Sequence, residues 1–266
     1  MSYSIIVITA LFAFILAFVL GLALGFFRTF FAVQEDPLIG RIREVLPGAN
    51  CGACSYPGCD GYAAAVASKQ ATGNKCTVGG SAVAEKIAAL IGSEASMISV
   101  VAVLTCQGSK EHAPIKGTYT GLRTCRGAKL STGSTKLCAW GCLGFGDCVA
   151  VCQFGALSIG TDGLLHVDRE RCTGCGICIS ECPQNLLVGI PRNQVGPLAR
   201  CSNHAAVRAS VRKTCTIGCI KCELCVKNCS QHCITMVNGI PAIDYNLCTN
   251  CGTCMSKCPV KVLDSI

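Results

Sequence analysis

The cysteines of this 266-residue chain recur in one fixed spacing, which restricts the fold more than any other feature. The segments CTGCGICISECP, from Cys172, and CTNCGTCMSKCP, from Cys248, both read C-x2-C-x2-C-x3-C followed by proline. This spacing is typical of proteins that hold two [4Fe–4S] clusters, in which three close cysteines bind one cluster and the fourth binds the other. Zinc ribbons use separated pairs of cysteines instead. The two segments therefore predict iron–sulfur clusters rather than zinc.

Each of these segments is preceded by a second cysteine block. CIKCELCVKNC, from Cys219, repeats the spacing without the proline, whereas CAWGCLGFGDCVAVC, from Cys138, has the spacings x3, x5 and x3. The later copy also shows x3, x5 and x3 when it is counted from Cys215, so Cys222 aligns with Phe145. Between the blocks of each copy lies a stretch that reads strand, glycine-containing turn, strand: GALSIGTDGLLHVD and CITMVNGIPAID. The pattern predicts a duplicated double-cluster module of the α+β ferredoxin fold.

The ferredoxin arrangement also predicts which cysteines share a cluster. Because the fourth cysteine of a block reaches the partner's cluster, each cluster takes three cysteines from one block and one from the other. In the first copy, where Phe145 stands at the position of the middle ligand, we expect Cys138 to replace it. The predicted ligand sets are Cys138, Cys142, Cys148 and Cys182; Cys172, Cys175, Cys178 and Cys152; Cys219, Cys222, Cys225 and Cys258; and Cys248, Cys251, Cys254 and Cys229.

A third group of cysteines precedes the two copies. In NCGACSYPGCDGYAAAV, Cys51, Cys54 and Cys59 lie close together, and Cys76 is the next cysteine available as a fourth ligand. The spacing x2, x4, x16 is not that of a ferredoxin. On chemistry alone, this group is compatible with a [4Fe–4S] cluster or with a zinc ion.

Two short helices are predicted around this third group. GYAAAVASKQ, residues 61–70, is rich in strong helix formers with small side chains. SAVAEKIAALIG predicts a second helix, with Ser81 as its N-cap and Gly92 as the residue that ends it. In so small a helical domain the bound metal would replace bulky core side chains.

The N-terminal part of the chain predicts a membrane anchor. The 23 residues from Ile5 to Phe27 carry no charge, and as a helix they would span the roughly 30 Å hydrocarbon core of a bilayer. A cleaved signal peptide is disfavoured, because no basic residue precedes the run and no small-residue cleavage site follows it. Arg28, Arg41 and Arg43 follow the run, so the positive-inside rule places the rest of the chain in the cytosol. The reducing cytosol favours metal-bound thiolates over disulfides.

Charge and motifs exclude several other classes of protein. The formal charge is +8, but the basic residues form no run with interleaved aromatic side chains, so we expect no nucleic-acid partner. We find no nucleophile–base pair, phosphate-binding loop or dinucleotide-binding glycine motif after a strand, and therefore expect no catalytic residue and no NAD or flavin site. The histidines share no ligand spacing and are expected at the surface or in packing: His112, His166, His204 and His232.

The order of these features resembles that of the B subunits of Rnf complexes, membrane-bound ferredoxin:NAD oxidoreductases that pump Na+ or H+. The resemblance covers nearly the whole chain: the membrane helix, the motif LPGANCGACSYPGCDGYAAAV…C from Leu46 to Cys76, and the ferredoxin modules. Two modules are present, as in the longer members of the family. The resemblance implies that Cys51, Cys54, Cys59 and Cys76 bind a [4Fe–4S] cluster.

The resemblance also implies a function and a location. Soluble reduced ferredoxin would donate electrons, and the clusters would relay them toward the other membrane and peripheral subunits of the complex. Residues 5–27 would lie in the lipid bilayer of the cell (inner) membrane as a single pass, with the cluster domains in the cytoplasm. A membrane-anchored polyferredoxin that serves another reductase without ion pumping is the alternative with the same chemistry. A zinc-rich structural adaptor is the alternative from a different class.

These expectations divide the chain into four parts. They are the anchor, the helical [4Fe–4S] domain, the first ferredoxin-like module with its N-terminal extension, and the second module: residues 1–28, 29–95, 96–200 and 201–266. About five clusters use twenty cysteines and leave Cys106, Cys125, Cys201, Cys215 and Cys233. These are packing or vestigial cysteines in a reducing compartment, or else a sixth cluster is held by Cys106, Cys125, Cys201 and Cys215.

Overall fold

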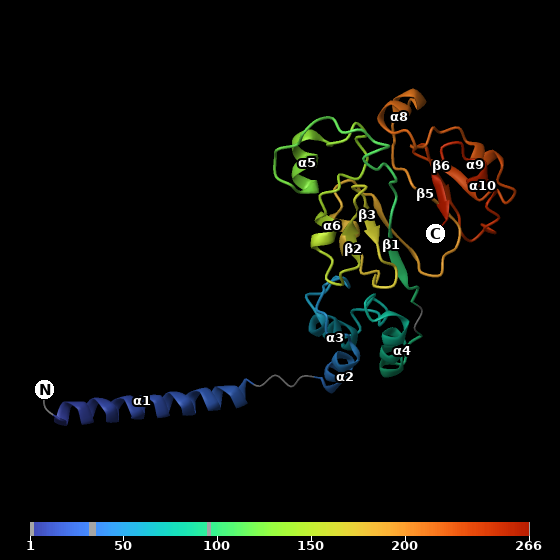
Figure 1. Ribbon diagram of the computed structural model, residues 1–266. Coiled ribbons are helices and arrows are strands. Elements are labelled where there is room, and N and C mark those ends of the chain that lie inside the picture. The colour runs from blue at the N-terminus through green and yellow to red at the C-terminus, as the bar shows by residue number, and fades with distance from the viewer. Residues whose placement is uncertain (1–2, 32–35, 95–96, 266) are drawn as a thin grey trace.

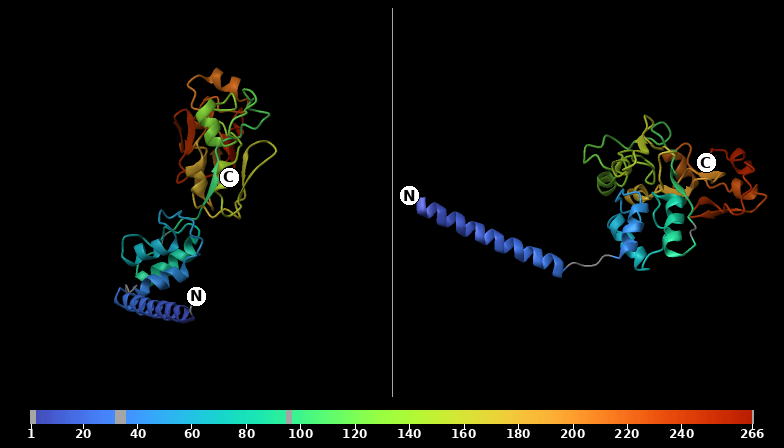
Figure 2. Two further views of the ribbon diagram at one scale, coloured as in Figure 1. Left: turned by 90° about the vertical axis from the view of Figure 1, so that its left-hand side faces the viewer. Right: turned by 90° about the horizontal axis from the view of Figure 1, so that it is seen from below.

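The computed structural model, which describes residues 3–31, 36–94 and 97–265, begins with a single long apolar helix. This helix, α1 (Tyr3–Phe30), lies apart from the other elements in Figures 1 and 2. Its span Ile5–Phe27 has a mean hydropathy of 3.0, and none of it is buried against the rest of the chain. Within the described residues it is the one helix long and apolar enough to cross a membrane, and it has the predicted bounds.

Three short helices form a helical unit after α1 (Figure 1). They are α2 (Pro37–Val45), α3 (Cys59–Ala67) and α4 (Gly80–Ile91). α2 begins where the Asp36 carboxylate accepts a hydrogen bond from a backbone N–H of the first turn, and α2 packs against both α3 and α4. The centre of the unit is formed by side chains that are at most 1% exposed: Ile42, Tyr62, Val66 and Ile87.

Both helices predicted around the third cysteine group are present, but the start of α4 differs from the prediction. α4 begins at Gly80 with Gly79 as its N-cap, so Ser81 lies inside the helix and does not cap it. The turn that carries Cys76 runs directly into the helix, because the Cys76 carbonyl accepts a hydrogen bond from the Gly80 N–H at 3.1 Å. Gly92 ends the helix as predicted, in the left-handed conformation with a φ of 68°.

Each ferredoxin module contains the predicted β-hairpin. The hairpins pair β2 (Leu157–Ile159) with β3 (Leu165–Val167), and β6 (Ile234–Val237) with β7 (Ile240–Ile243), both antiparallel. Each module also has two short helices: α6 (Asp147–Ala150) and α7 (Ile177–Glu181), then α9 (Leu224–Lys227) and α10 (Thr253–Ser256). The N-cap residue of all four helices is left-handed: Gly146, Gly176, Glu223 and Gly252. The same turn therefore occurs four times, and the α+β ferredoxin fold is confirmed.

A strand that the sequence did not predict precedes each module and pairs with the strand at the end of that module. β1 (Val100–Leu104) pairs antiparallel with β4 (Leu187–Pro191), and β5 (Pro197–Ala199) with β8 (Leu263–Ser265). Leu104 opposes Leu187, and Ala199 opposes Leu263, so the two pairs are equivalent. Because β5 belongs to the sheet of the second module, this pairing favours a module boundary slightly before the predicted one at residue 200.

The segments after β1 and β5 run through the junction of the two modules. The Gln107 N–H donates to the Arg200 carbonyl at 3.2 Å, and the hydroxyl oxygens of Thr105 and Ser202 are 2.9 Å apart. Two more helices follow these segments in the chain: α5 (Cys125–Thr132) and α8 (Arg208–Thr214). The modules are therefore held to each other by hydrogen bonds between equivalent segments.

Candidate iron–sulfur sites

The four cysteines of the helical unit form one group, here named site 1: Cys51, Cys54, Cys59 and Cys76. Asn50 holds the first loop, because its side-chain oxygen accepts a hydrogen bond from the Cys59 N–H at 2.8 Å. Tyr62 holds the loop before the last cysteine. Its hydroxyl donates to the Thr72 carbonyl at 2.8 Å and accepts from the Lys75 N–H at 3.1 Å. Burial raises the pKa of the Cys76 thiol, and the other thiols of the site raise it further.

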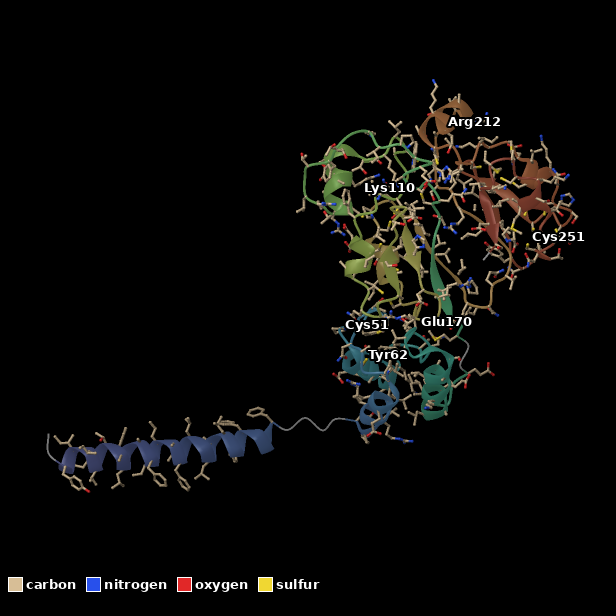
Figure 3. The ribbon with its side chains drawn as sticks, in the orientation of Figure 1. Cys51, Tyr62, Lys110, Glu170, Arg212 and Cys251 are labelled. Carbon is tan, nitrogen blue, oxygen red and sulfur yellow. The ribbon has the colours of Figure 1, made fainter. Side chains whose placement is uncertain are left out.

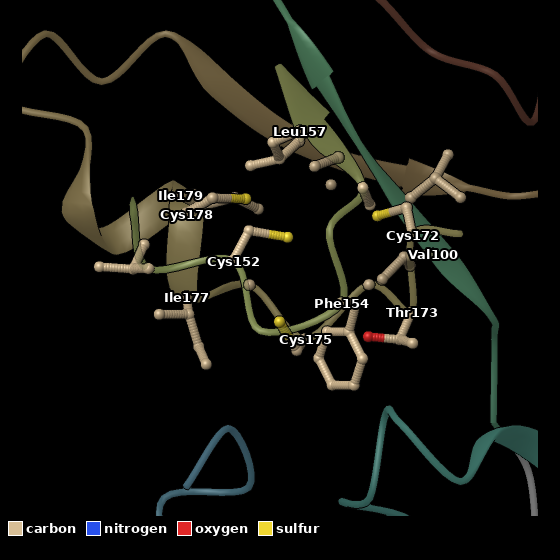
Figure 4. Close-up of a pocket in the computed structure, with 17 residues that line it drawn as sticks. Val100, Cys152, Phe154, Leu157, Cys172, Thr173, Cys175, Ile177, Cys178 and Ile179 are labelled. Carbon is tan, nitrogen blue, oxygen red and sulfur yellow. The ribbon is translucent and has the colours of Figure 1, made fainter. Parts of the chain in front are cut away.

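Site 2 is a pocket in the first module, and its lining includes Cys152, Cys172, Cys175 and Cys178. Figure 4 shows these four side chains around the centre of the pocket. The structure thus brings together the set that the crossover of the fourth ligand predicts. The loop of site 2 requires glycine at Gly174, where φ is 68° and a Cβ would lie 2.2 Å from the carbonyl oxygen of Val100.

Site 3 is a second pocket in the first module, and it differs from the prediction. Its cysteines are Cys125, Cys142, Cys148 and Cys182, so Cys125 stands where Cys138 was expected. Asp147 explains the difference, because its carboxylate accepts hydrogen bonds from the N–H groups of Cys125 at 2.7 Å and Arg126 at 2.9 Å. These bonds dock the start of α5 on the loop of site 3. Burial, together with the thiols of Cys142 and Cys125, raises the pKa of Cys148 to about 12.

The second module contains the two remaining predicted groups. Site 4 consists of Cys219, Cys222, Cys225 and Cys258, and site 5 of Cys229, Cys248, Cys251 and Cys254. In site 4, burial raises the pKa of Cys219 to about 11, and the thiols of Cys225 and Cys258 contribute. In site 5, Cys229 and Cys254 both interact electrostatically with Cys251. A fifth cysteine lies beside this site: the Cys233 sulfur is 3.4 Å from that of Cys229.

Cys138 lies in a different group from the one that its spacing to Cys142 suggested. Burial raises the pKa of the Cys138 thiol, and the thiols of Cys106 and Cys201 raise it further. The sequence held a signal for this placement. The counterpart of Cys138 in the second copy is Cys215, which is present although Cys222 already supplies the middle ligand there. Because Cys215 is not required as the middle ligand in the second copy, Cys138 at the equivalent position was not required as a ligand of site 3.

The sites follow one another along the molecule. Electrostatic interactions join cysteines of neighbouring sites: Cys51 with Cys175, Cys178 with Cys148, and Cys225 with Cys254. In Figure 3, Cys51 lies where the helical unit meets the first module, and Cys251 lies at the outer edge of the second module. The thiols thus extend from the helical unit to the far end of the chain.

Every site offers four thiols, which suit a [4Fe–4S] cluster or a zinc ion. A zinc ion with Zn–S bonds of about 2.3 Å needs sulfurs about 3.8 Å apart. Among residues 3–31, 36–94 and 97–265, no three His, Cys, Asp or Glu side chains converge so as to hold a single metal ion. A four-iron cluster binds one thiolate at each iron, and each site offers four thiols. Backbone N–H groups also point at cysteine sulfurs, as is typical of clusters: Leu186 to Cys182 at 3.5 Å and Val262 to Cys258 at 3.3 Å.

Three family models match segments of the chain that contain these cysteines. They describe an Fe-S cluster at residues 46–78, a 4Fe-4S binding domain at residues 165–188 and a 4Fe-4S dicluster domain at residues 218–262. The first segment contains all of site 1, and the third contains all of sites 4 and 5. The chain therefore binds [4Fe–4S] clusters.

Several relatives are similar over most of the chain. The B subunit of the Na(+)-translocating ferredoxin:NAD(+) oxidoreductase complex of Acetobacterium woodii is 41% identical over 234 residues, which cover 88% of this chain and 70% of the relative. The B subunit of the ion-translocating oxidoreductase complex of Methanosarcina acetivorans is 38% identical over 88% of both chains. The B subunit of the proton-translocating ferredoxin:NAD(+) oxidoreductase complex of Clostridium ljungdahlii is 37% identical over 89% of this chain and 84% of the relative. The sequence identity, the apolar helix and the tandem cluster modules all agree with these relatives. The chain therefore belongs to the family of B subunits of ion-translocating ferredoxin:NAD oxidoreductase (Rnf) complexes.

Proposed function

We propose that this chain is the electron relay of its complex. It accepts electrons from reduced ferredoxin at the second module and passes them one at a time through clusters at sites 5, 4, 3, 2 and 1. Other subunits in the membrane receive them and couple their flow to the translocation of Na+ or H+. The observation that carries the proposal is the succession of thiol sites from Cys251 at the outer edge to Cys51 in the helical unit.

The second module has the properties of an entry point for electrons. Cys251 of site 5 is exposed, whereas the other cysteines, all of them among the described residues, are half-buried or buried. Residues 201–266 contain seven Lys or Arg residues against three Asp or Glu residues. Lys227 and Lys257 are exposed at the ends of the short helices α9 and α10 that carry cysteines of sites 4 and 5. This excess of positive charge favours an acidic electron donor.

Site 1 has the properties of the exit. Cys51 follows the last residue of the apolar span, Phe27, by 24 residues, so site 1 is tethered near the membrane. Arg28, Arg41 and Arg43 follow the span, and by the positive-inside rule the cluster domains lie on the cytoplasmic side. In this arrangement the chain consists of a single-pass anchor, a helical cluster domain and two double-cluster modules.

The test uses anaerobic membrane vesicles that contain the whole complex. Replacing Cys54→Ala at site 1 is expected to abolish ferredoxin-dependent NAD reduction and the ion gradient, while sites 2 to 5 remain reducible in electron paramagnetic resonance spectra. The matched control is Ser68→Ala, which removes an exposed hydroxyl that bonds only to backbone carbonyls of α3, in the same helical unit, and is expected to retain both activities. A polyferredoxin that serves another reductase predicts the opposite: NAD reduction and the gradient would persist without a functional site 1.

A further inference from the structure

Four buried cysteines at the junction of the two modules remain outside sites 1 to 5. They are between 6% and 9% exposed, and we name them the junction group: Cys106, Cys138, Cys201 and Cys215. Two come from the first module and two from the second. Buried thiols from four separate segments that meet at one place are the feature that the five proposed sites do not explain.

The junction group consists of two pairs of equivalent positions. Cys106 lies two residues after Leu104, and Cys201 two residues after Ala199, which are equivalent in the paired strands. Cys138 and Cys215 each precede the first cysteine of a block by the same x3 spacing. The duplication therefore brings matching cysteines together from both sides of the junction.

Two observations show that the four thiols are close to one another. A Cβ on Gly108 would lie 3.5 Å from the Cys215 sulfur and 3.7 Å from the Cys106 sulfur. Burial raises the pKa of Cys215 to about 11, and the thiols of Cys138, Cys106 and Cys201 contribute to the shift. The sulfurs nevertheless do not converge as a single metal ion requires, within the residues that the structure describes.

The surroundings suit a buried cluster with a net negative charge. Asn203, which is 2% exposed, donates from its side-chain nitrogen to the Cys138 sulfur at 3.7 Å. Lys136 is 5% exposed and places its ammonium in this region, where it donates to the Gly108 carbonyl at 2.7 Å. Burial raises the pKa of Cys201, and the positive charge of Lys221 acts in the opposite direction. The positive charges of Lys136 and Lys221 would thus offset the negative charge of a cluster bound at the junction.

The junction group also contacts the sites on either side of it. The N–H of Cys142, in site 3, donates to the Cys106 sulfur at 3.5 Å. The N–H of Cys219, in site 4, donates to the Cys201 sulfur at 3.3 Å. These two hydrogen bonds are equivalent in the duplication, and each connects the junction group to a cysteine of a neighbouring site.

We propose that Cys106, Cys138, Cys201 and Cys215 bind a sixth [4Fe–4S] cluster that connects the two ferredoxin modules. Its role as a connection rests on the proposed function, whereas its presence does not. When bound there, the cluster would supply one-electron transfer between sites 4 and 3, to which the N–H groups of Cys219 and Cys142 connect the junction group, and no bond would form or break. This ligand set replaces the one expected from the sequence, in which Cys125 stood in the place of Cys138.

The test measures iron, acid-labile sulfide and zinc in the full-length chain, purified anaerobically in detergent. The wild-type chain is expected to hold about 24 irons and 24 sulfides. Cys138→Ala combined with Cys201→Ala removes two ligands of one cluster, so about four irons and four sulfides are lost. Cys125→Ala combined with Cys201→Ala removes one ligand from each of two clusters, so two spectroscopic signals change. If the sixth cluster were instead held by Cys106, Cys125, Cys201 and Cys215, the results would be reversed. Cys125→Ala with Cys201→Ala would then remove two ligands of one cluster, and Cys138→Ala with Cys201→Ala would remove one ligand from each of two clusters.

Controls separate loss of the cluster from loss of the fold. Val211→Ala, which shortens a fully buried side chain of α8 that is no metal ligand, is expected to retain all iron, and Cys138→Ser with Cys201→Ser keeps nearly the original volume. A wild-type chain with about 20 irons, or the loss of zinc instead of iron from the double variant, would overturn the proposal. So would an unchanged iron content in either double variant at positions 138 and 201. Because metal content is measured without activity, an intact junction cluster in membranes that lack ferredoxin-dependent NAD reduction would refute only the proposed function.

Discussion

Tyr62 is the residue whose replacement best tests how the helical unit holds site 1. Its ring is 1% exposed, and its hydroxyl bridges the Thr72 carbonyl and the Lys75 N–H. Tyr62→Phe keeps the buried ring and removes both hydrogen bonds. Each contributes about 1 kcal/mol net, so the loop before Cys76 should lose about 2 kcal/mol of stability. Since 1.4 kcal/mol corresponds to a factor of ten, the loop should open about 30-fold more often.

Hydrogen–deuterium exchange of the intact chain measures this opening directly, because the Lys75 amide is one of the groups released. The peptide that contains residues 72–76 is expected to exchange about 30-fold faster, while peptides of the second module remain unchanged. Tyr56→Phe is the matched control: its ring lies 5.6 Å from that of Tyr62. Exchange within about twofold of wild type in Tyr62→Phe, or an equal acceleration in Tyr56→Phe, would show that the two hydrogen bonds do not hold the loop.

Four further outcomes are expected. Gly174→Ala should destabilise the first module by more than 2 kcal/mol in denaturant titrations, whereas Gly176→Ala, left-handed but with nothing within 4 Å of its Cβ, should cost about 1 to 2 kcal/mol. Asp147→Asn weakens the capping of α5, and exchange of the first amides of α5 should rise about tenfold. Lys227→Glu with Lys257→Glu should slow electron uptake from ferredoxin in stopped-flow measurements, and the difference should shrink as ionic strength rises. Removing iron with a chelator should expose the amides of the second module before those of the helical unit, because four of the nine buried core residues of the second module are cysteines of the proposed ligand sets, whereas none of the buried core residues of the helical unit is a cysteine.

Local spacing explains which parts of the fold the sequence could predict. The cysteine blocks and the hairpins β2–β3 and β6–β7 are formed by residues close in sequence, and both hairpins are present. β1 and β5 were missed, because their partners β4 and β8 lie more than 60 residues away and no local turn signals the pairing. The N-cap of α4 was missed for a related reason, since Gly79 and the Cys76 carbonyl start that helix without a capping side chain.

The placement of Cys125 and Cys138 shows the limit of reasoning from spacing. Cys138 is four residues before Cys142, whereas Cys125 is seventeen before it, so proximity in sequence favoured Cys138 for site 3. The Asp147 carboxylate reverses this order by docking the start of α5 on site 3. Such a long-range hydrogen bond produces no repeated spacing in the sequence from which it could be predicted. The duplication did leave one, because Cys215 repeats the position of Cys138, and repeated positions are expected to have the same role.

The cysteines that we propose form the relay also form much of the core of the second module, and this would link electron transfer to stability. The buried core of the helical unit is made of aliphatic and aromatic side chains, and its cysteines only pack against that core. In the second module, by contrast, four of the nine buried core residues are cysteines of the proposed ligand sets: Cys201, Cys219, Cys229 and Cys254. Thiolate–iron bonds must then supply cohesion that apolar side chains supply elsewhere. The second module, which we propose receives the electrons, therefore depends on its clusters for its fold more than the helical unit does.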